Sequence, residues 1–483
     1  MSDLYRRLGV RTYVDLTATE TIFGGAPMLP QVHDAMATLP PDSIVLDELM
    51  ERVGARVADL LHAPAALVTS GAAGALTAAT CACMAGGDPE LAVALPDVAG
   101  LASRMIMPVE SRSVFDQPLR ATGARLVAVA DDTELVAAFA EKPALVAMWA
   151  GAAGRQVITF ERLVELARRA EVPVVVDAAA ELPARPNAWL DRGADLVCYS
   201  GGKILQGPQG AGLLLGRRDL VEAAWLHSAP HGTFGRMMKV SKEEIAGMLA
   251  AVEHLVAGRD LAAEFERWRG WYGEIAAAVG CVPGATTEIV ERGGRSPYPI
   301  LMVRWDPEVV PLSAGEVGAR LRAGSPPVLS HAEGEGTEFM VRAVSMREGD
   351  QRVAARRLAE VLSAAAGPPP AAPPADVSGD WRITMRFVAG EGRHRLSLRQ
   401  AGARVSGRHD GTRSSGEVVG EVRGDGVTLR SVLSIEGANL TYRMSGQVDR
   451  SANTISGDVV LGEQLVDGFG VGSVTWRAER EEP

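Results

Sequence analysis

Apolar runs alternate with amphipathic stretches along the first three quarters of the chain. Short, almost continuous apolar segments are typical of strands buried on both faces, and they occur at residues 65–70, 125–130, 144–150, 172–179 and 195–200. A stretch such as 160–171, FERLVELARRAE, has instead the apolar face of a helix. Strands that alternate with helices predict an α/β domain with a mostly parallel sheet.

The pattern becomes more mixed after about residue 255. A long helical stretch at 261–279 is followed by strands and helices to about residue 365, which predicts a smaller α/β lobe. The Pro/Ala tract AGPPPAAPPAD, residues 366–376, cannot pack as a helix or a central strand. It predicts a semi-rigid linker.

Apolar and polar residues alternate strictly in the C-terminal part. This pattern occurs at residues 380–387, 394–402, 403–411, 416–434, 439–449 and 472–480, with glycine-rich turns between them. It predicts a small antiparallel β-barrel or sandwich. Trp381 and Trp476 lie near its two ends, and we expect them to fill its core.

These patterns divide the chain into five parts. They are an N-terminal arm (1–50), a large domain (51–255), a small lobe (256–365), the linker (366–376) and an antiparallel β domain (377–483).

Composition and charge exclude several classes of function. The net charge of −11 argues against a general nucleic-acid binder and against docking on anionic membranes. The start of the chain lacks the apolar core of a signal peptide, and no run is long enough to span a bilayer. Cys81, Cys83, Cys198 and Cys281 have the spacing of neither a zinc site nor a disulfide scaffold. We interpret them as buried thiols in a reducing cytoplasm.

Three predicted strand ends carry residues that suit a ligand. Ser70-Gly71-Ala72 lies between a strand and a helix, where backbone N–H groups bind anions. Asp177 ends a second strand, and Lys203 follows a third. Parallel sheets bind ligands beyond the carboxyl ends of their strands, so we expect these residues around one cleft.

An anion cradle, a carboxylate and an amine are the groups that pyridoxal phosphate requires. The phosphate needs N–H donors, the aldehyde needs a lysine to form a Schiff base, and the ring nitrogen needs an acid partner. Each residue also has a simpler explanation as an ordinary turn, a cap or a solvated lysine. Their order and context favour the cofactor. His227 and His231 are four residues apart but lack the Glu of a zinc motif, so we predict no metal site.

The first 365 or so residues resemble the SelA-like family of fold-type-I pyridoxal-phosphate enzymes. The family includes selenocysteine synthases and proteins similar to D-glucosaminate-6-phosphate ammonia-lyase. The matching stretches are 48–76, 174–183, 193–220 and 235–253, and Ser-Gly-Gly-Lys at 200–203 with Gly-Pro-Gln after it is the most diagnostic. The resemblance implies a pyridoxal-phosphate-binding large domain, a small lobe, and at least a homodimer. It does not extend past the linker.

The resemblance also implies roles for individual residues. Lys203 would form the Schiff base and move the α-proton, and Asp177 would pair with the pyridinium. The remaining cofactor-binding residues implied are Ser70, Gly71, Ala72, Ser200 and Gln209, with Gln206 on the same loop. Arg236 and Lys239 would hold the substrate carboxylate.

Two stretches depart from the family pattern. Relatives open with an Asn-Ala-x-Gly-Thr-like stretch, whereas this chain has Asp15-Leu16-Thr17-Ala18-Thr19, in which a Cβ replaces a glycine. Ser111-Arg112 stands where relatives often have His-Arg. The residue that stacks on the cofactor ring is therefore not identified by the sequence.

We predict a lyase that acts on a small amino acid or amino sugar acid and releases ammonia and a 2-keto acid. A pyridoxal-phosphate-dependent racemase or aminotransferase is the alternative within enzymes. A cofactor-binding sensor without activity is the alternative of another class, and the departures at 15–19 and 111 motivate it. Neither nucleic acid nor a membrane is an expected partner.

Overall fold

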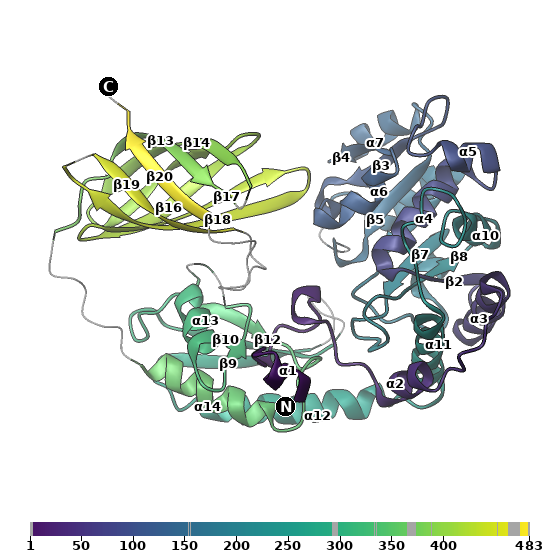
Figure 1. The fold of residues 1–483 in the computed structure, drawn as a ribbon, viewed down its shortest axis with the longest axis horizontal. Helices are drawn as coiled ribbons and strands as arrows, with labels where there is room; N and C mark the ends of the chain where they lie inside the picture. Colours follow the sequence, from purple (N-terminus) through teal and green to yellow (C-terminus); the bar gives the residue numbers. More distant parts are fainter. Residues whose placement is uncertain are drawn as a thin grey trace. The chain divides into compact units, whose positions relative to one another are not determined.

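The computed structural model describes residues 3–152, 154, 156–291, 298–332, 334, 336–364, 373–387, 389–451, 453–461 and 474–481. The chain forms two compact units, Met1–Ala365 and Ala366–Pro483 (Figure 1). The predicted linker, 366–376, lies outside the described residues as far as residue 372.

A seven-stranded sheet forms the centre of the first unit, in the order β2-β8-β7-β6-β5-β3-β4. Its strands are β2 (Ala65–Thr69), β3 (Arg104–Pro108), β4 (Arg125–Val129), β5 (Leu145–Trp149), β6 (Val174–Asp177), β7 (Leu196–Ser200) and β8 (Gly212–Gly216). Neighbouring strands are parallel except at β8, which is antiparallel to both β2 and β7. The predicted mostly parallel sheet is confirmed.

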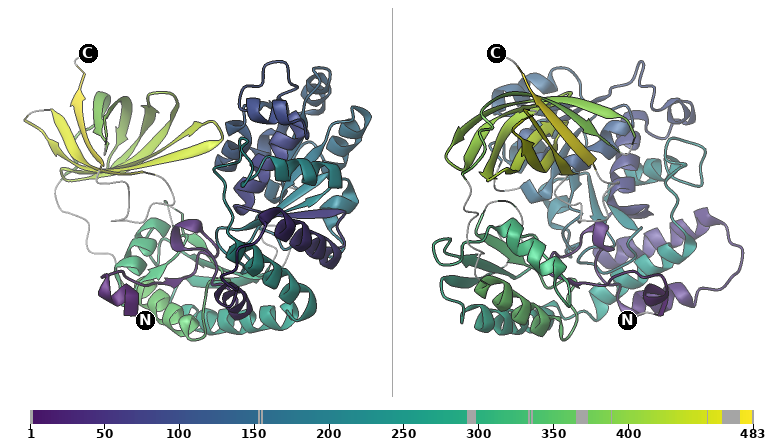
Figure 2. Two further views of the ribbon diagram at one scale, coloured as in Figure 1. Left: turned by 45° about the vertical axis from the view of Figure 1, so that its right-hand side comes forward. Right: turned by 60° about the vertical axis from the view of Figure 1, so that its left-hand side comes forward.

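The helices of the chain before residue 258 include several that pack against this sheet, among them α4 (Figure 2). They are α1 (Asp3–Arg7), α2 (Pro30–Ala37), α3 (Leu46–Leu61), α4 (Gly71–Ala85), α5 (Pro89–Ala94), α6 (Gln117–Ala121), α7 (Asp132–Phe139), α8 (Phe160–Arg169), α9 (Ala188–Arg192), α10 (Arg218–Leu226) and α11 (Lys242–Ala257). Helix α4 contacts β5, β6, β7 and β8, and most of its residues are buried. Its alanines and glycines allow this, because a helix that is apolar all round is stable only inside a core.

The small lobe is built on an antiparallel sheet in the order β12-β10-β9. Its elements are α12 (Leu261–Val279), β9 (Ala285–Val290), β10 (Ile300–Trp305), α13 (Ala314–Ala323), β12 (Glu338–Val341) and α14 (Asp350–Ser363). Separately, β1 (Val14–Asp15) pairs in parallel with β11 (Val328–Leu329). The N-terminal segment therefore belongs to this lobe through β1.

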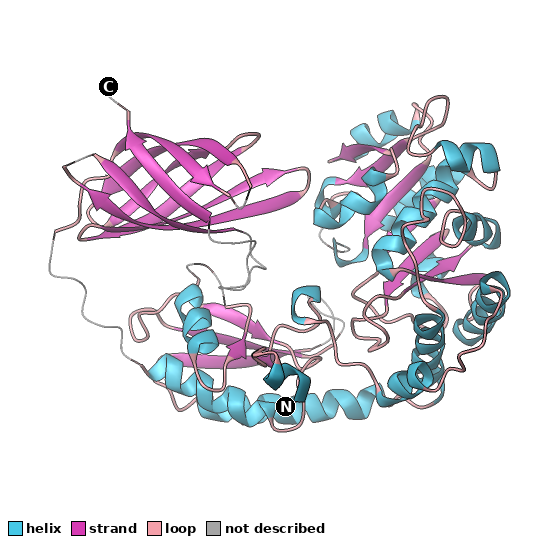
Figure 3. Ribbon diagram, viewed as in Figure 1, coloured by secondary structure: helices cyan, strands magenta, loops and turns pink. Residues whose placement is uncertain are grey.

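The second unit is a closed antiparallel barrel, drawn entirely as strands and loops in Figure 3. Its strands are β13 (Gly379–Arg386), β14 (Glu391–Ala401), β15 (Arg404–Asp410), β16 (Ser415–Arg423), β17 (Gly426–Ile435), β18 (Ala438–Asp449), β19 (Thr454–Leu461) and β20 (Val474–Arg480). Pairing of β13 with β20 closes it. Trp381 and Trp476 are buried in its core, as expected, and Ala375 packs there too.

Two further expectations concern membrane-spanning helices and the burial of the cysteine thiols. Within the described residues, no helix has both the length and the apolar character needed to cross a bilayer. Cys81 and Cys198 are buried and Cys83 is partly buried, but Cys281 is exposed. The expectation of four buried thiols is wrong for Cys281, because it follows the end of α12 at the surface.

Candidate active site

Three predicted strand ends lie along one edge of the seven-stranded sheet. Thr69 at the end of β2 and Ser200 at the end of β7 both pair with Gly212 at the start of β8. Asp177 at the end of β6 pairs with Cys198 of β7. Since β2, β6 and β7 run in the same direction, their carboxyl ends open onto one crevice, the usual place for a ligand in an open α/β sheet.

The turn between β2 and α4 presents backbone N–H groups without helical partners. Ser70 is the N-cap but its side chain makes no capping hydrogen bond, and the first helical bond runs from Gly74 N to the Ser70 carbonyl. The N–H groups of the preceding residues, including Gly71 and Ala72, therefore have no acceptor in the helix. Gly71 has a φ of +65°, and a Cβ on Gly212 would lie 2.4 Å from the Gly71 carbonyl carbon. This turn suits an anion.

Asp177 presents one carboxylate oxygen to the crevice. Its Oδ1 accepts hydrogen bonds from Ala179 N at 3.0 Å and from Cys198 Sγ at 3.5 Å, while the described residues supply no donor to Oδ2. Burial raises the pKa of Asp177, and the Ala179 hydrogen bond and the charge of Lys203 oppose that rise. A buried carboxylate of this kind is stabilised most by a positively charged donor.

Lys203 lies beside an exposed aromatic ring. Its Nζ is 5.8 Å from the centroid of the Phe115 ring, and Phe115 is 55% exposed. Phe115 and Asp177 line the same cavity of about 20 Å³, together with Ser111 and Ser113. Phe115 is not among the site residues predicted from the sequence. The available signal was that Phe115 is the one aromatic residue in the polar stretch 109–120.

The side chains of Gln209 and Gln206 lie on the same loop but point in different directions. The Gln209 side chain lies so close to Gly25 and Gly202 that a Cβ at either position would overlap its Oε1. That oxygen is buried and has no hydrogen-bond partner among the described residues. Gln206 Oε1 instead accepts a hydrogen bond from Arg259 Nη2 at 3.0 Å and lines a separate cavity. Of the two, Gln209 is the one beside the Lys203 segment.

The two predicted substrate-binding cations lie on the segment before α11. Arg236 and Lys239 are both exposed. Met238, between them, approaches the first turn of α4, where its Sδ would lie 3.8 Å from a Cβ on Gly74. No described hydrogen bond or ion pair links either cation to Lys203 or Asp177. Both side chains are therefore available to a ligand.

The segment from Asp15 to Thr19, which departs from the family pattern, is held by local hydrogen bonds. Asp15 Oδ1 accepts hydrogen bonds from both N and Oγ1 of Thr17 at 2.7 Å, and burial raises the Asp15 pKa. Ala18 is buried with a φ of +110°, in the region that favours glycine. The segment then reaches the Lys203 loop, where Ala26 N donates to the Gly202 carbonyl at 3.0 Å.

Ser111 and Arg112, the other departure, are held by neighbouring residues. Ser111 Oγ accepts hydrogen bonds from Trp149 N at 3.2 Å and from Gln156 Nε2 at 2.9 Å. Arg112 Nε donates to Asp116 Oδ2 at 2.5 Å. These bonds fix the rim of the crevice, so neither side chain is placed to cover a flat ligand.

The described residues contain no group of three His, Cys, Asp or Glu side chains that could hold a metal ion. His227 Nε2 bonds the Gly86 carbonyl at 2.9 Å, and His231 Nε2 lies 3.1 Å from Asp47 Oδ1. Both histidines therefore connect elements of the large domain.

Comparison with known proteins places this geometry in a family context. A family model described as aminotransferase class-V matches residues 32–248. D-glucosaminate-6-phosphate ammonia lyase of Salmonella typhimurium is 27% identical over 380 residues, which cover 75% of this chain and 99% of that protein. The 5'-C-glycyluridine monooxygenase-decarboxylase of a Streptomyces species is 30% identical over 341 residues, 67% of this chain and 83% of that protein.

Two further matches bear on the predicted resemblance. An L-seryl-tRNA(Sec) selenium transferase of Moorella thermoacetica is 30% identical over 240 residues, 44% of this chain and 49% of that protein. A solved structure of D-glucosaminate-6-phosphate ammonia-lyase has a TM-score of 0.64, with 24% identity over 75% of this chain and 98% of that one. The resemblance inferred from the motifs and the predicted fold are both confirmed.

Proposed function

Because this chain belongs to the aminotransferase class-V family, in which membership implies dependence on pyridoxal phosphate, we propose that it is a pyridoxal-phosphate-dependent lyase. Its substrate is an amino acid or amino sugar acid that loses an α-proton and a β-leaving group such as hydroxyl. The products are ammonia and a 2-keto acid. One observation carries the proposal: the ends of β2, β6 and β7 bring the Ser70 turn, Asp177 and the Lys203 loop to one crevice.

The residues present fit the cofactor. Asp177 Oδ2 has no donor among the described residues and would accept the ring N–H, while the N–H groups at Ser70, Gly71 and Ala72 would bind the phosphate. Lys203 supplies the amine for the aldehyde, and the exposed face of Phe115 would cover the ring. When bound, pyridoxal phosphate withdraws electrons from the α-carbon of an attached amino compound.

Further residues of the family prediction complete the cofactor site in this proposal. Ser200, at the end of β7, would donate its hydroxyl to the phosphate. Gln209, whose buried Oε1 has no hydrogen-bond partner among the described residues, would supply an acceptor for a donor group of the cofactor. Gln206 is not part of it, because its side chain bonds Arg259.

Lys203 and Asp177 would have distinct tasks in the reaction. The Lys203 amine is the general base that removes the α-proton and later delivers a proton to the leaving group. Asp177 would hold the ring nitrogen of bound pyridoxal phosphate in its protonated form. The burial that raises the pKa of Asp177 would favour a close charge pair with that ring over separated charges.

Arg236 and Lys239 are the proposed carboxylate-binding residues. They are cations with no described ion pair on a segment that passes the first turn of α4 through Met238. Arginine binds a carboxylate through two parallel hydrogen bonds, so it would fix the α-carbon relative to the base. We further propose a homodimer, as is typical of the family.

The lyase is preferred to a racemase because the ammonia lyase aligns with 99% of its own length. A racemase also needs a second acid opposite Lys203. Asp15 has the raised pKa that such an acid requires, but its Oδ1 is bonded to Thr17 within the small-lobe segment.

Borohydride trapping tests the central assignment. The sequence holds four lysines, Lys142, Lys203, Lys239 and Lys242, so peptide mapping of the reduced protein distinguishes them. We expect a yellow protein with the adduct on Lys203 and no adduct in Lys203→Ala. The matched variant Lys239→Ala should keep the adduct and raise KM. An adduct on another lysine, or none, contradicts the proposal.

A substrate panel tests the reaction type. Ammonia and keto-acid release should be measured across D- and L-hydroxy amino acids and amino sugar acids. Loss of optical activity without ammonia would indicate a racemase. Cofactor binding without turnover of any compound would indicate a sensor.

A further inference from the structure

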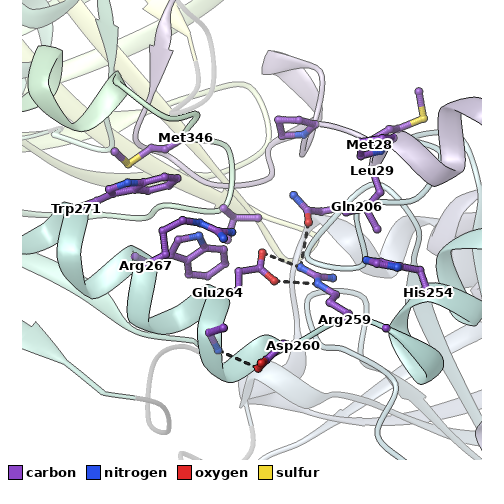
Figure 4. A pocket seen from close by; sticks show the side chains of 16 residues that line it. Met28, Leu29, Gln206, His254, Arg259, Asp260, Glu264, Arg267, Trp271 and Met346 are labelled. Atoms are coloured by element: carbon purple, nitrogen blue, oxygen red, sulfur yellow. Dashed lines mark hydrogen bonds and ion pairs between the residues drawn. The ribbon is translucent and has the colours of Figure 1, made fainter.

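The first unit also contains a cavity apart from the crevice at Asp177. It has a volume of about 430 Å³, which lies in the range of small-molecule sites. Its lining comes from the N-terminal segment, the Lys203 loop, the end of α11, the first turns of α12 and the segment after β12 (Figure 4). Neither Lys203 nor Asp177 lines it.

Arg259 and Glu264 form the floor of this cavity as a neutral pair. Arg259 Nε and Nη2 donate to the two Glu264 oxygens at 2.9 and 3.0 Å, and the Arg259 side chain is only 4% exposed. Arg259 Nη1 also donates to the Ile204 carbonyl at 2.7 Å. Both charges are therefore balanced, and the pair would not bind a ligand ion by itself.

The floor fixes the orientation of Gln206. Its Oε1 accepts from Arg259 Nη2, and arginine is a donor only. The Gln206 amide nitrogen must therefore point away from Arg259. In Figure 4 it points into the open part of the cavity, and no described residue accepts a hydrogen bond from it.

Two more donors face the same space. The Arg267 guanidinium lies 5.8 Å from the Trp271 ring centroid, and the described residues give it no carboxylate partner. His254 lies on the opposite wall, and its imidazole also has no hydrogen bond among the described residues (Figure 4). The nearest acids are engaged, since Glu264 binds Arg259 and Asp260 Oδ1 caps α12 through Ala263 N.

Apolar side chains make up the rest of the wall. They include Met28, Leu29, Trp268, Trp271, Val344 and Met346. A guanidinium, an amide and an imidazole supply the donors for two carboxylate oxygens, whereas a doubly charged phosphate would need more cations than Arg267. We propose that this cavity binds an organic carboxylate with a flat apolar body, such as an aromatic acid.

A ligand in this cavity would contact Gln206, which is hydrogen-bonded to the backbone of the Lys203 loop. Gln206 N donates to the Lys203 carbonyl at 2.8 Å, and Leu29 N donates to the Gln206 carbonyl at 3.0 Å. Gln206 thus connects the cavity wall with the backbone of Lys203. Carboxylate binding in this cavity does not require the cofactor, so it can be tested separately from the proposed lyase activity.

Phenylacetate and its uncharged analogue phenylacetamide are matched probes. By isothermal titration to the full-length protein, phenylacetate should bind with a roughly millimolar dissociation constant, as expected for so small a ligand. Phenylacetamide should bind about 10-fold more weakly, because it lacks the charge. Arg267→Gln should abolish the difference between the two probes, and Arg125→Gln, an exposed residue of β4, should leave it unchanged.

Hydrogen exchange locates the site without any variant. Phenylacetate should slow exchange in peptides that cover 27–30, 203–209 and 258–271. Absence of binding overturns the proposal, as does equal binding of the two probes or protection confined to other segments.

Discussion

The Lys203 ammonium nitrogen lies 5.8 Å from the centroid of the Phe115 ring. Phe115 therefore lies beside this amine, whereas the side chains of Ser111 and Arg112 bond other residues. An exposed ring at this place identifies a residue that the sequence analysis could not.

Removal of the Phe115 ring should weaken cofactor binding without unfolding the protein. Stacked aromatic pairs contribute about 0.5–1.5 kcal/mol, so Phe115→Ala should raise the dissociation constant of pyridoxal phosphate about 2- to 10-fold. Absorbance titration of the cofactor-free protein measures this. Phe115→Trp, which keeps a flat face, is the control. Equal affinity in the wild type and Phe115→Ala would show that the ring does not stack.

Asp177 should destabilise the cofactor-free protein as the pH rises. Burial raises its pKa above the ordinary 3.8, so the native state holds the proton more tightly than the unfolded chain. Its stabilising contribution is complete below pH 3.8 and is lost as pH rises through the native pKa. Thermal unfolding of cofactor-free Asp177→Asn should therefore show higher stability than the wild type near neutral pH, and the gap should close toward pH 4. A constant gap would contradict the assignment. The variant should also lose cofactor-dependent activity.

Ala18 should be a position where glycine stabilises the fold. A non-glycine residue at a φ of +110° carries backbone strain of about 1 kcal/mol or more. Relief of about 1–3 kcal/mol of strain, less the roughly 0.4–1 kcal/mol that glycine costs through the entropy of the unfolded chain, should raise the free energy of unfolding of Ala18→Gly by up to about 2 kcal/mol. Ala26→Gly, at an ordinary φ, is the matched control and should destabilise by about 0.5–1 kcal/mol. If both variants lose stability in denaturant titrations, Ala18 is not strained.

The barrel should lose stability in weak acid because of a buried histidine pair. His394 Nδ1 lies 2.9 Å from His409 Nε2, and His409 Nδ1 lies 2.6 Å from Ser431 Oγ. Burial and the charge of His394 lower the His409 pKa from 6.5 to about 4, and the nearby Asp410 charge opposes this. Both rings pack edge-on against Tyr442.

A lowered pKa means that the unfolded chain takes up the proton first. Stability is therefore complete above pH 6.5 and falls by about 3 kcal/mol as the pH drops through 4. The protection factors of barrel peptides in the full-length protein, which correct for the slower intrinsic exchange in acid, should fall over this range. His409→Gln should flatten the dependence, whereas His33→Gln, on the surface of the other unit, should not. The same slope in both variants would exclude the pair as the cause.

Strong patterns in the sequence predicted most of the architecture. The apolar runs at β2, β5, β6 and β7 and the alternation in the barrel gave the correct sheet types. Strand β3, with the short run RMIMP, and β19, TISGDVVL, were not predicted. A five-residue apolar run has no distinctive period, and glycine interrupts the alternation in β19.

The contacts within the candidate site were predicted less completely, because residues that are neighbours in space need not share a pattern in the sequence. The placement of the Ser70 turn, Asp177 and the Lys203 loop at one edge follows from strand direction, which the apolar runs reveal. The opposite directions of Gln206 and Gln209 depend on Arg259, a residue far along the chain that binds only one of them. The roles of all these residues stay predictions.

Barrel closure by β13 and β20 has a consequence for biosynthesis. Every other described pair of the barrel joins strands that are consecutive in sequence, whereas this one brings Trp381 opposite Arg480. On the ribosome, the nascent sheet thus keeps two open edges until β20 has emerged, long after the catalytic unit has been synthesised. A chaperone that recognises unpaired strands would meet this segment during that interval.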